Sequence, residues 1–269
     1  MIRTIVVPLD GSEFAERALG PATVLASRLD TGLRFVTTRW GDDAVAPARY
    51  LEEVASRVEV PADVVVVHDR EAAEAIRVVV GEAPDSVVCM TTHGRSGLGQ
   101  ALLGSVAEEV LRSLDHPVLL VGPSVDASWP SAWERMLVCT DGSDASQAVL
   151  PVAAEWSRAL GLEPWLVQVI SPEAVREAEL SGANGGAAES GLLRHLAQEL
   201  GEEASWEVLH GDDPARAVVQ YTRSRPFSLV ATSTHGRSGL ARVTLGSVAM
   251  KVVHDCPAPV LIVRPSDLS

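Results

Sequence analysis

The sequence contains two copies of one pattern, and this internal repeat limits the possible folds more than any other feature. The block His-Gly-Arg-Ser-Gly-Leu stands at residues 93–98 and again at 235–240, and Leu-Gly-Ser-Val-Ala stands at 103–107 and again at 245–249, each 142 residues later. A unit of this length is far longer than the repeats of solenoid proteins. Each copy is therefore expected to fold as a domain of its own.

The repeat sets the expected domain bounds. We place the first domain at residues 1–123, a linker at 124–134 and the second domain at 135–265. The linker is the Pro-, Ser- and Trp-containing stretch between the two copies.

The second copy is longer than the first between its early and late motifs. An Asp-Gly-Ser tripeptide begins at Asp10 and again at Asp141, only 131 residues later, so the second copy has 11 extra residues before its later motifs. We place the surplus in Ser181–Ala188, whose glycines predict a flexible loop.

Short apolar runs rich in β-branched residues alternate with amphipathic helical patterns in both copies. In the first copy the expected strands are Thr4–Leu9, Leu33–Thr38, Ala62–His68, Ser86–Thr91 and Val118–Val121. The expected helices between them are Glu13–Leu29, Pro47–Val58, Glu71–Gly81 and Ser105–Leu114. In the second copy the expected strands are Met136–Thr140, Trp165–Ile170, Trp206–His210, Ser228–Ser233 and Val260–Val263. Strands that are apolar on both faces are typical of a parallel sheet covered by helices. The predicted fold class is α/β, with two tandem five-stranded parallel-sheet sandwiches that have helices on both faces.

Charge and cysteine content exclude several classes of protein. The 22 basic and 36 acidic residues leave a net charge of −14, which argues against nucleic acid or an anionic membrane as a partner. The three cysteines are isolated and odd in number, which argues against a disulfide framework. No apolar stretch approaches the ~20 residues that span a bilayer, so a cytoplasmic protein is expected.

A glycine-containing segment follows the fourth expected strand of each copy. In the first copy nine residues separate Gly94 from Gly104, and Ser105 opens a helix. Glycine permits a positive φ and close approach of a ligand to the backbone, and a helix N-terminus offers unpaired N–H groups at a positive dipole end. Arg95 adds a cation, so the segment is suited to phosphate. The corresponding residues of the second copy are Gly236, Arg237, Gly246 and Ser247.

Asp10 and Asp141 each come just after the first strand of their copy. Ligands of open parallel sheets bind at the carboxyl ends of strands, where the strand order reverses. An ionised carboxylate only accepts hydrogen bonds. Its natural partners at this place are a ribose hydroxyl or a Mg²⁺ ion that bridges phosphates.

Structural roles are an alternative for these residues. Asp10 and Ser12 are common N-cap residues, and both fit the start of a helix. Gly94, Gly104 and Ser105 fit a tight turn that leads into a helix. No phosphate loop with a lysine, no nucleophile elbow and no His-Glu-x-x-His motif is present, so catalysis has little support.

Taken together, the Asp-Gly-Ser tripeptide, the two blocks around residues 93–107 and 235–249, and the closing strands at 117–121 and 259–263 resemble the universal stress protein family. The resemblance covers nearly the whole chain twice, as in a tandem member. It implies the adenine nucleotide alpha hydrolase-like form of the α/β fold and, in one branch of the family, ATP binding. That branch is marked by Gly-x2-Gly-x9-Gly-Ser/Thr.

The resemblance implies a role for each matching residue. The glycines and the serine of the two loops would hold the phosphates. Asp10 and Asp141 would face the ribose or Mg²⁺, and the backbone near Val36 and Val169 would face adenine.

Both copies depart from the branch pattern at its first glycine. Thr91 stands three residues before Gly94, and Ser233 stands three residues before Gly236. A β-carbon at either position can crowd a nucleotide. Because Ser is smaller than the β-branched Thr, the second copy is expected to tolerate a nucleotide better.

These observations lead to a preferred hypothesis about function and to an alternative in which the chain binds no nucleotide. The chain is expected to bind ATP with Mg²⁺ and to act as a nucleotide-responsive regulator of unidentified protein partners in stress or dormancy adaptation, with at most slow ATP hydrolysis. The alternative is a nucleotide-independent protein-interaction module with degraded nucleotide sites. The family also implies a homodimer in which the domains of each chain pair about an internal pseudo-twofold axis.

Overall fold

The computed structural model describes residues 2–38, 45–94, 103–126, 133–180, 185–234 and 245–265. The chain separates into two compact units, Met1–Ser131 and Ala132–Ser269. The finer bounds expected from the sequence, with a linker at 124–134, stay a prediction. No helix within the described residues is long and apolar enough to cross a membrane.

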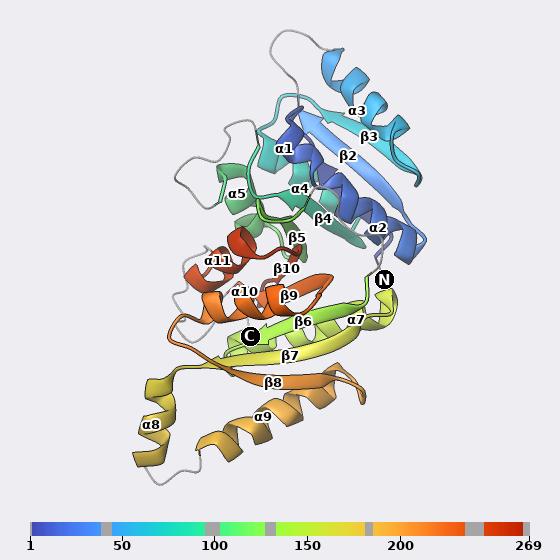
Figure 1. Ribbon diagram of the computed structural model, residues 1–269. Coiled ribbons are helices and arrows are strands. Elements are labelled where there is room, and N and C mark those ends of the chain that lie inside the picture. Colours follow the sequence, from blue (N-terminus) through green and yellow to red (C-terminus); the bar gives the residue numbers. More distant parts are fainter. Residues whose placement is uncertain are drawn as a thin grey trace. The chain divides into compact units, whose positions relative to one another are not determined.

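The first unit is built on a five-stranded parallel sheet (Figure 1). Its strands lie in the order β3-β2-β1-β4-β5, with every pair parallel. Their bounds are Thr4–Pro8 for β1, Gly32–Thr38 for β2, Ala62–Val67 for β3, Ser86–Thr91 for β4 and Val118–Val121 for β5. The order reverses between β1 and β4, because the chain first runs outward to β3 and then returns.

The second unit repeats this topology, with its strands in the order β8-β7-β6-β9-β10. The strand bounds are Arg135–Thr140 for β6, Glu163–Ile170 for β7, Ser205–His210 for β8, Leu229–Ser233 for β9 and Val260–Val263 for β10. The predicted α/β fold with parallel sheets is confirmed.

Helices cover both faces of each sheet. In the first unit they are α1 (Glu13–Glu16), α2 (Leu19–Leu29), α3 (Ala46–Ser56), α4 (Ala72–Glu82) and α5 (Ser105–Ser113). In the second they are α6 (Asp144–Gln147), α7 (Val149–Leu160), α9 (Gly185–Leu200), α10 (Pro214–Ser224) and α11 (Ser247–Asp255). Helix α8 (Pro172–Leu180) precedes α9 and packs against it. Right-handed crossovers place α2 and α3 on one face and α4 and α5 on the other. In agreement, α4 packs against α5, and α10 packs against α11.

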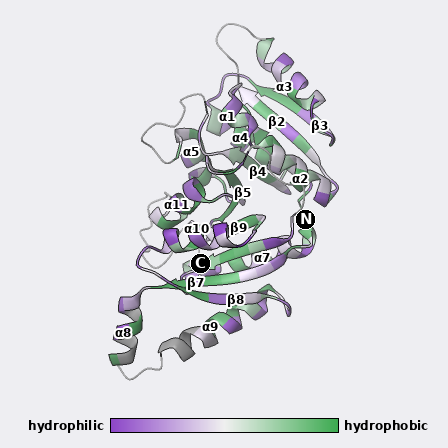
Figure 2. Ribbon diagram, in the orientation of Figure 1, coloured by the Kyte–Doolittle hydropathy of each residue, from purple (hydrophilic) through white to green (hydrophobic). Residues whose placement is uncertain are grey.

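The sheets carry the core because their central strands are buried on both faces. All six residues of β4 are buried, and so are the three middle residues of its neighbour β1. Helix α3 instead alternates between hydrophilic and hydrophobic residues, as expected of a covering helix with one solvated side (Figure 2).

The single helix expected over Glu13–Leu29 is wrong, because the structure divides it into α1 and α2. Pro21 is the third residue of α2, and a proline ring clashes with the carbonyl of the residue four positions earlier. The second unit has the same break between α6 and α7, with Pro151 as the third residue of α7.

The extra residues of the second copy lie in the connection between β7 and β8. This connection covers residues 171–204, whereas its counterpart between β2 and β3 covers 39–61, a difference of 11 residues. The flexible loop expected at Ser181–Ala188 is wrong for its second half, since α9 begins at Gly185. Helix formation is cooperative, and the alanines at 187 and 188 favour its extension toward the N-terminus. Residues 181–184 lie outside the described residues.

Candidate nucleotide site

A cavity of about 420 Å³ opens at the carboxyl end of the sheet of the first unit. It lies between β1 and β4, where the strand order reverses, and this is the position at which open parallel sheets bind ligands. Its volume is within the range of small-molecule sites. Six of the predicted site residues line this first cavity: Asp10, Val36, Thr91, Gly94, Gly104 and Ser105.

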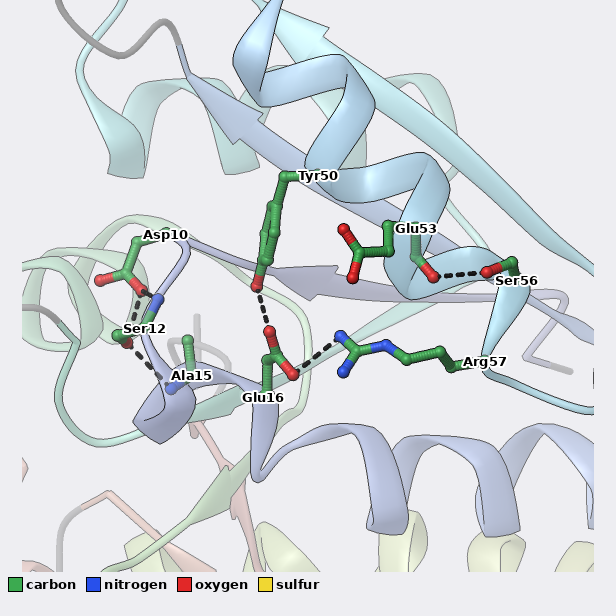
Figure 3. A network of polar contacts seen from close by, with 8 residues as sticks. All are labelled: Asp10, Ser12, Ala15, Glu16, Tyr50, Glu53, Ser56 and Arg57. Carbon is green, nitrogen blue, oxygen red and sulfur yellow. Dashed lines mark hydrogen bonds and ion pairs between the residues drawn. The ribbon is translucent and has the colours of Figure 1, made fainter.

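The Asp-Gly-Ser turn forms one wall of the first cavity. Asp10 Oδ1 accepts hydrogen bonds from Ser12 N at 3.0 Å and from Ser12 Oγ at 2.6 Å (Figure 3). Gly11 adopts the positive φ of 83° that this turn requires. Ser12 Oγ in turn accepts from Ala15 N at 3.1 Å and caps α1. The N-cap role considered for this motif therefore belongs to Ser12, and Asp10 orients it.

The first turn of α5 forms another wall of the first cavity. Gly104 is the N-cap of this helix, and its N–H donates to the carbonyl of Thr92 at 2.7 Å. A β-carbon at position 104 would lie 2.9 Å from that carbonyl oxygen, although Gly104 has an ordinary φ of −74°. Glycine is therefore required here because the Thr92 carbonyl approaches it closely. The positive φ expected from the sequence is wrong for Gly104, and close approach of a ligand stays a prediction.

The N-terminus of α5 opens into the first cavity without a side-chain cap. Gly104, the N-cap residue, has no side chain that could cap the helix, and the next three residues, Ser105, Val106 and Ala107, line the cavity. Ser105 is the first helical residue and not the cap. The backbone N–H groups of this turn are the donors that favour an anion.

The second unit has an equivalent cavity of about 400 Å³. Five of the predicted site residues line this second cavity: Asp141, Val169, Ser233, Gly246 and Ser247. Asp141 Oδ1 accepts from Ser143 N at 3.0 Å and from Ser143 Oγ at 2.6 Å, and Gly142 has a φ of 82°. The geometry of the first turn is thus repeated.

Helix α11 begins in the second cavity as α5 does in the first. Gly246 is its N-cap, without a side-chain capping bond, and donates to the carbonyl of Thr234 at 2.9 Å. A β-carbon at position 246 would lie 3.1 Å from that carbonyl oxygen, so the approach is slightly looser than at Gly104. Arg95, Gly236 and Arg237 were also predicted as site residues and lie outside the described residues.

The positions of the missing first glycines are the ends of β4 and β9. Thr91 is 5% exposed and Ser233 is 4% exposed, and each lines its cavity. Thr91 Oγ1 donates to the carbonyl of His93 at 2.7 Å, which fixes the backbone that leads to Gly94. These side chains are part of the cavity walls.

The strand register gives Val169 a different counterpart from Val36. Pro8 pairs with Val36, and the residue that matches Pro8 in the second copy, Cys139, pairs with Val167. Val169 therefore matches Thr38, which also lines the first cavity. The carbonyl of Val36 accepts from Leu9 N at 2.9 Å within the sheet.

Two polar residues of the second cavity were missed by sequence reasoning. Thr140 Oγ1 lies 2.8 Å from Ser146 Oγ and accepts from Gly142 N at 3.0 Å, which braces the turn that carries Asp141. Gln168 is buried in β7 and donates from Nε2 to the carbonyl of Asp141 at 3.4 Å. The only available signal was that Thr140 and Gln168 are polar residues within apolar strands.

Among the described residues no three His, Cys, Asp or Glu side chains form a group that could hold a metal ion. His93 Nδ1 lies 3.0 Å from Thr92 Oγ1, and its ring meets Phe14 edge to face. Burial raises the pKa of the Cys89 and Cys139 thiols, which keeps them protonated and unreactive. The described walls of the cavities therefore offer backbone donors for an anion at the helix N-termini and a carboxylate at each Asp turn.

A polar network ties α3 to the turn beside the first cavity. Glu16 accepts hydrogen bonds from Tyr50 Oη at 3.0 Å and from Arg57 Nη2 at 2.8 Å (Figure 3). Burial, followed by the bond to Glu16, raises the pKa of Tyr50. At the matching place in the second unit, Gln147 donates to the carbonyl of Gly142 at 3.3 Å.

Known proteins resemble the chain in sequence and in fold. The model of the universal stress protein family matches residues 39–122 and 132–264. Universal stress protein Rv2005c of Mycobacterium tuberculosis H37Rv is 33% identical over 191 residues, which are 67% of this chain and 62% of that protein. The chain thus matches less than two thirds of the length of this relative.

Two solved structures share the fold over almost the whole chain. A universal stress protein from Archaeoglobus fulgidus DSM 4304 has a TM-score of 0.71 at 21% identity and covers 98% of both chains. PA1789 of Pseudomonas aeruginosa PAO1, a protein of unknown function, has a TM-score of 0.71 at 15% identity and covers 99% of this chain and 94% of its own. These structures show the fold, and the two matches to the family model, with the relative Rv2005c, show that the chain belongs to the universal stress protein family.

Proposed function

We propose that each domain binds ATP together with Mg²⁺ and that the chain is a nucleotide-responsive regulator. The observation that carries this proposal is a helix that begins at a glycine N-cap, which has no capping side chain, in the wall of a cavity that an aspartate also lines, in both units. The donors at the helix fit phosphate oxygens, and the aspartate fits a ribose hydroxyl or a cation. A bound nucleotide would use both the helix N-terminus and the aspartate of each cavity. Its phosphates would lie at Ser105 or Ser247, and its ribose at Asp10 or Asp141.

The donor set also fits Mg²⁺ that arrives with the nucleotide. Mg²⁺ is commonly held by one or two carboxylates together with phosphate oxygens and water. Each cavity contributes such a carboxylate, Asp10 or Asp141, beside the start of a phosphate-binding helix. When bound, the cation would neutralise phosphate charge next to an acidic protein.

In this proposal the nucleotide acts by changing conformational populations. ATP that contacts both the Asp turn and the N-terminus of α5 or α11 favours the conformations that bind it, and the surface of each domain changes with them. Protein partners would read this surface. We place this activity in the cytoplasm and in stress or dormancy adaptation. The chain would act as a homodimer, and light scattering can measure the mass of that assembly.

The direct test is mass spectrometry of nucleotide released by denaturing the gently purified chain, with the ratio to protein. Two ATP per chain are expected. The matched variants Ser105→Glu and Ser247→Glu should each remove one, because a carboxylate at the first helical position repels phosphate but is favourable for the helix itself. Absence of nucleotide, with no heat of binding on addition of ATP and Mg²⁺, would refute the proposal.

A nucleotide-independent interaction module is the second candidate. Thr91 and Ser233 favour it, because their side chains stand buried in the cavity walls where the ATP-binding branch has glycine. The heat of binding on addition of ATP and Mg²⁺ separates the two candidates, because a nucleotide-independent module would give none. Such a module would also bind its partners equally with and without added ATP.

A further inference from the structure

Gln168 differs from the other polar residues of the second cavity in having a buried atom without a partner. The residue is 3% exposed, lies in β7 and lines the cavity. Its Oε1 accepts no hydrogen bond within the described part of the chain. Burial of an unsatisfied acceptor is unfavourable, and such an atom in a binding cavity points to a donor that a ligand supplies.

The orientation of the Gln168 amide is fixed by its other end. Nε2 donates to the carbonyl of Asp141 at 3.4 Å. If the amide turned over, Oε1 would face that carbonyl, and two acceptors would meet. The side chain therefore offers an acceptor, and not a donor, away from Asp141.

The strand order places Gln168 at the end of the cavity opposite the phosphate-binding helix. Helix α11 follows β9, the neighbour of β9 is β6, and the neighbour of β6 is β7. Adjacent strands lie about 4.8 Å apart, so β7 is about 10 Å from β9. With phosphates at Ser247 and a ribose at Asp141, the base of a nucleotide reaches β7.

We propose that Gln168 determines base specificity in the second site: its Oε1 accepts a hydrogen bond from the exocyclic amino group of a 6-aminopurine. This inference rests on the proposed function. Adenine carries an amino donor at position 6, whereas a 6-oxopurine carries an acceptor there. A 6-oxopurine would leave Oε1 unsatisfied and place a second acceptor against it.

The first site offers a contrast within the same chain. The strand register matches Gln168 with Thr37, which is 6% exposed and lines the first cavity. A threonine hydroxyl both donates and accepts. The first site is therefore expected to discriminate less between 6-amino- and 6-oxopurines than the second.

The test is calorimetric titration of the full chain with ATP and with ITP, each with Mg²⁺. Ser105→Glu isolates the second site, and Ser247→Glu isolates the first as the matched control. The second site should bind ATP roughly tenfold more tightly than ITP, and Gln168→Leu should bring this ratio close to one. The ratio at the first site should stay within about twofold, as expected where no fixed acceptor faces position 6.

The ratio separates base recognition from a structural role. If Gln168 only supported the Asp141 turn, Gln168→Leu would weaken ATP and ITP alike and leave their ratio unchanged, which would overturn the inference. Gln168→Thr, the residue that the first copy holds in this strand, should also abolish the preference if Gln168→Leu does not fold. Equal binding of ATP and ITP to Ser105→Glu would refute the role of Gln168 while the proposed function stands. Binding of neither nucleotide to the unmodified chain would refute both.

Discussion

The carboxylate of Asp10 lies directly against the backbone of Gly94, so that a β-carbon at position 94 would come 2.2 Å from Asp10 Oδ2 and 3.1 Å from its Cγ. The two residues are 84 positions apart and come from the ends of neighbouring strands. The Asp turn and Gly94 are thus in contact at the cavity, and any side chain at position 94 would displace the carboxylate.

Gly94→Ala should weaken ATP binding at the first site by about tenfold, or 1.4 kcal/mol. The added methyl group displaces the Asp10 carboxylate, whose Oδ1 is held by Ser12. Because the carboxylate is the end of a side chain, the free energy of unfolding should fall by only about 1 kcal/mol. Calorimetry in the Ser247→Glu background measures the affinity.

The matched control is Gly81→Ala in α4, where a β-carbon would meet nothing within 4 Å. This variant should keep its ATP affinity and gain up to about 1 kcal/mol in unfolding free energy, since alanine is the better helix residue. Unchanged ATP affinity in Gly94→Ala would show that the Asp10 carboxylate has no part in binding.

Gly104→Ala should destabilise its domain more than Gly246→Ala destabilises the other. The new β-carbon would lie 2.9 Å from the Thr92 carbonyl oxygen in the first case and 3.1 Å from the Thr234 carbonyl oxygen in the second. We expect losses of about 2 and about 1 kcal/mol, respectively.

Hydrogen–deuterium exchange resolves the two domains and measures both losses. Gly191→Ala in α9, where the added atom meets nothing within 4 Å, is the control and should not destabilise. An equal or larger loss in Gly246→Ala would contradict the argument from close approach.

The sequence predicted the sheets well because their strands are short, apolar and β-branched, and Ser86–Thr91 and Val118–Val121 begin and end where expected. The break before α2 was missed because Pro21 was read as part of a continuous apolar period. The spacing of apolar residues carries no information about the hydrogen bond that a proline cannot make or about the clash of its ring.

For the site, the positions of the repeated motifs were sufficient to predict that Asp10 lies near Gly94 and Gly104. Motifs at the carboxyl ends of neighbouring parallel strands must share one edge. The counterpart of Val169 and the place of Gln168 in the second cavity could not be obtained in this way. Both depend on the register between β6 and β7, which the amino-acid pattern of either strand alone does not fix.

The chain's two tyrosines should not ionise near pH 10 while it is folded. Burial raises the pKa of Tyr50 and of Tyr221 above the usual 10.0, and hydrogen bonds to Glu16 and Glu207 raise them further. Because the folded-state pKa is the higher one, this contribution to stability is complete below pH 10 and is lost as the pH rises above it.

Absorbance at 295 nm should therefore change only together with alkaline unfolding, followed by circular dichroism. Glu16→Gln should lower the pKa of Tyr50 only in part, since burial is the larger cause. A tyrosine that titrates near pH 10 before the secondary structure changes would show that one of the two hydroxyls is solvated.

Thr91→Gly should strengthen ATP binding at the first site several-fold while it destabilises the domain. The substitution removes a buried side chain from the cavity wall and restores the first glycine of the ATP-binding pattern. It also removes the hydrogen bond to the His93 carbonyl and places glycine in a strand, at a cost of about 1–2 kcal/mol.

Thr91→Ser separates these two effects. Serine keeps a hydroxyl for the His93 carbonyl and is the residue at the matching position 233 of the second copy. Affinity for ATP in the Ser247→Glu background should therefore rise in the order Thr91, Thr91→Ser, Thr91→Gly, because the volume of the side chain at position 91 falls in the same order. If all three proteins bind ATP equally, the β-carbon at position 91 does not crowd the nucleotide, and the residue at this position gives no reason to expect weaker binding in the first copy than in the second.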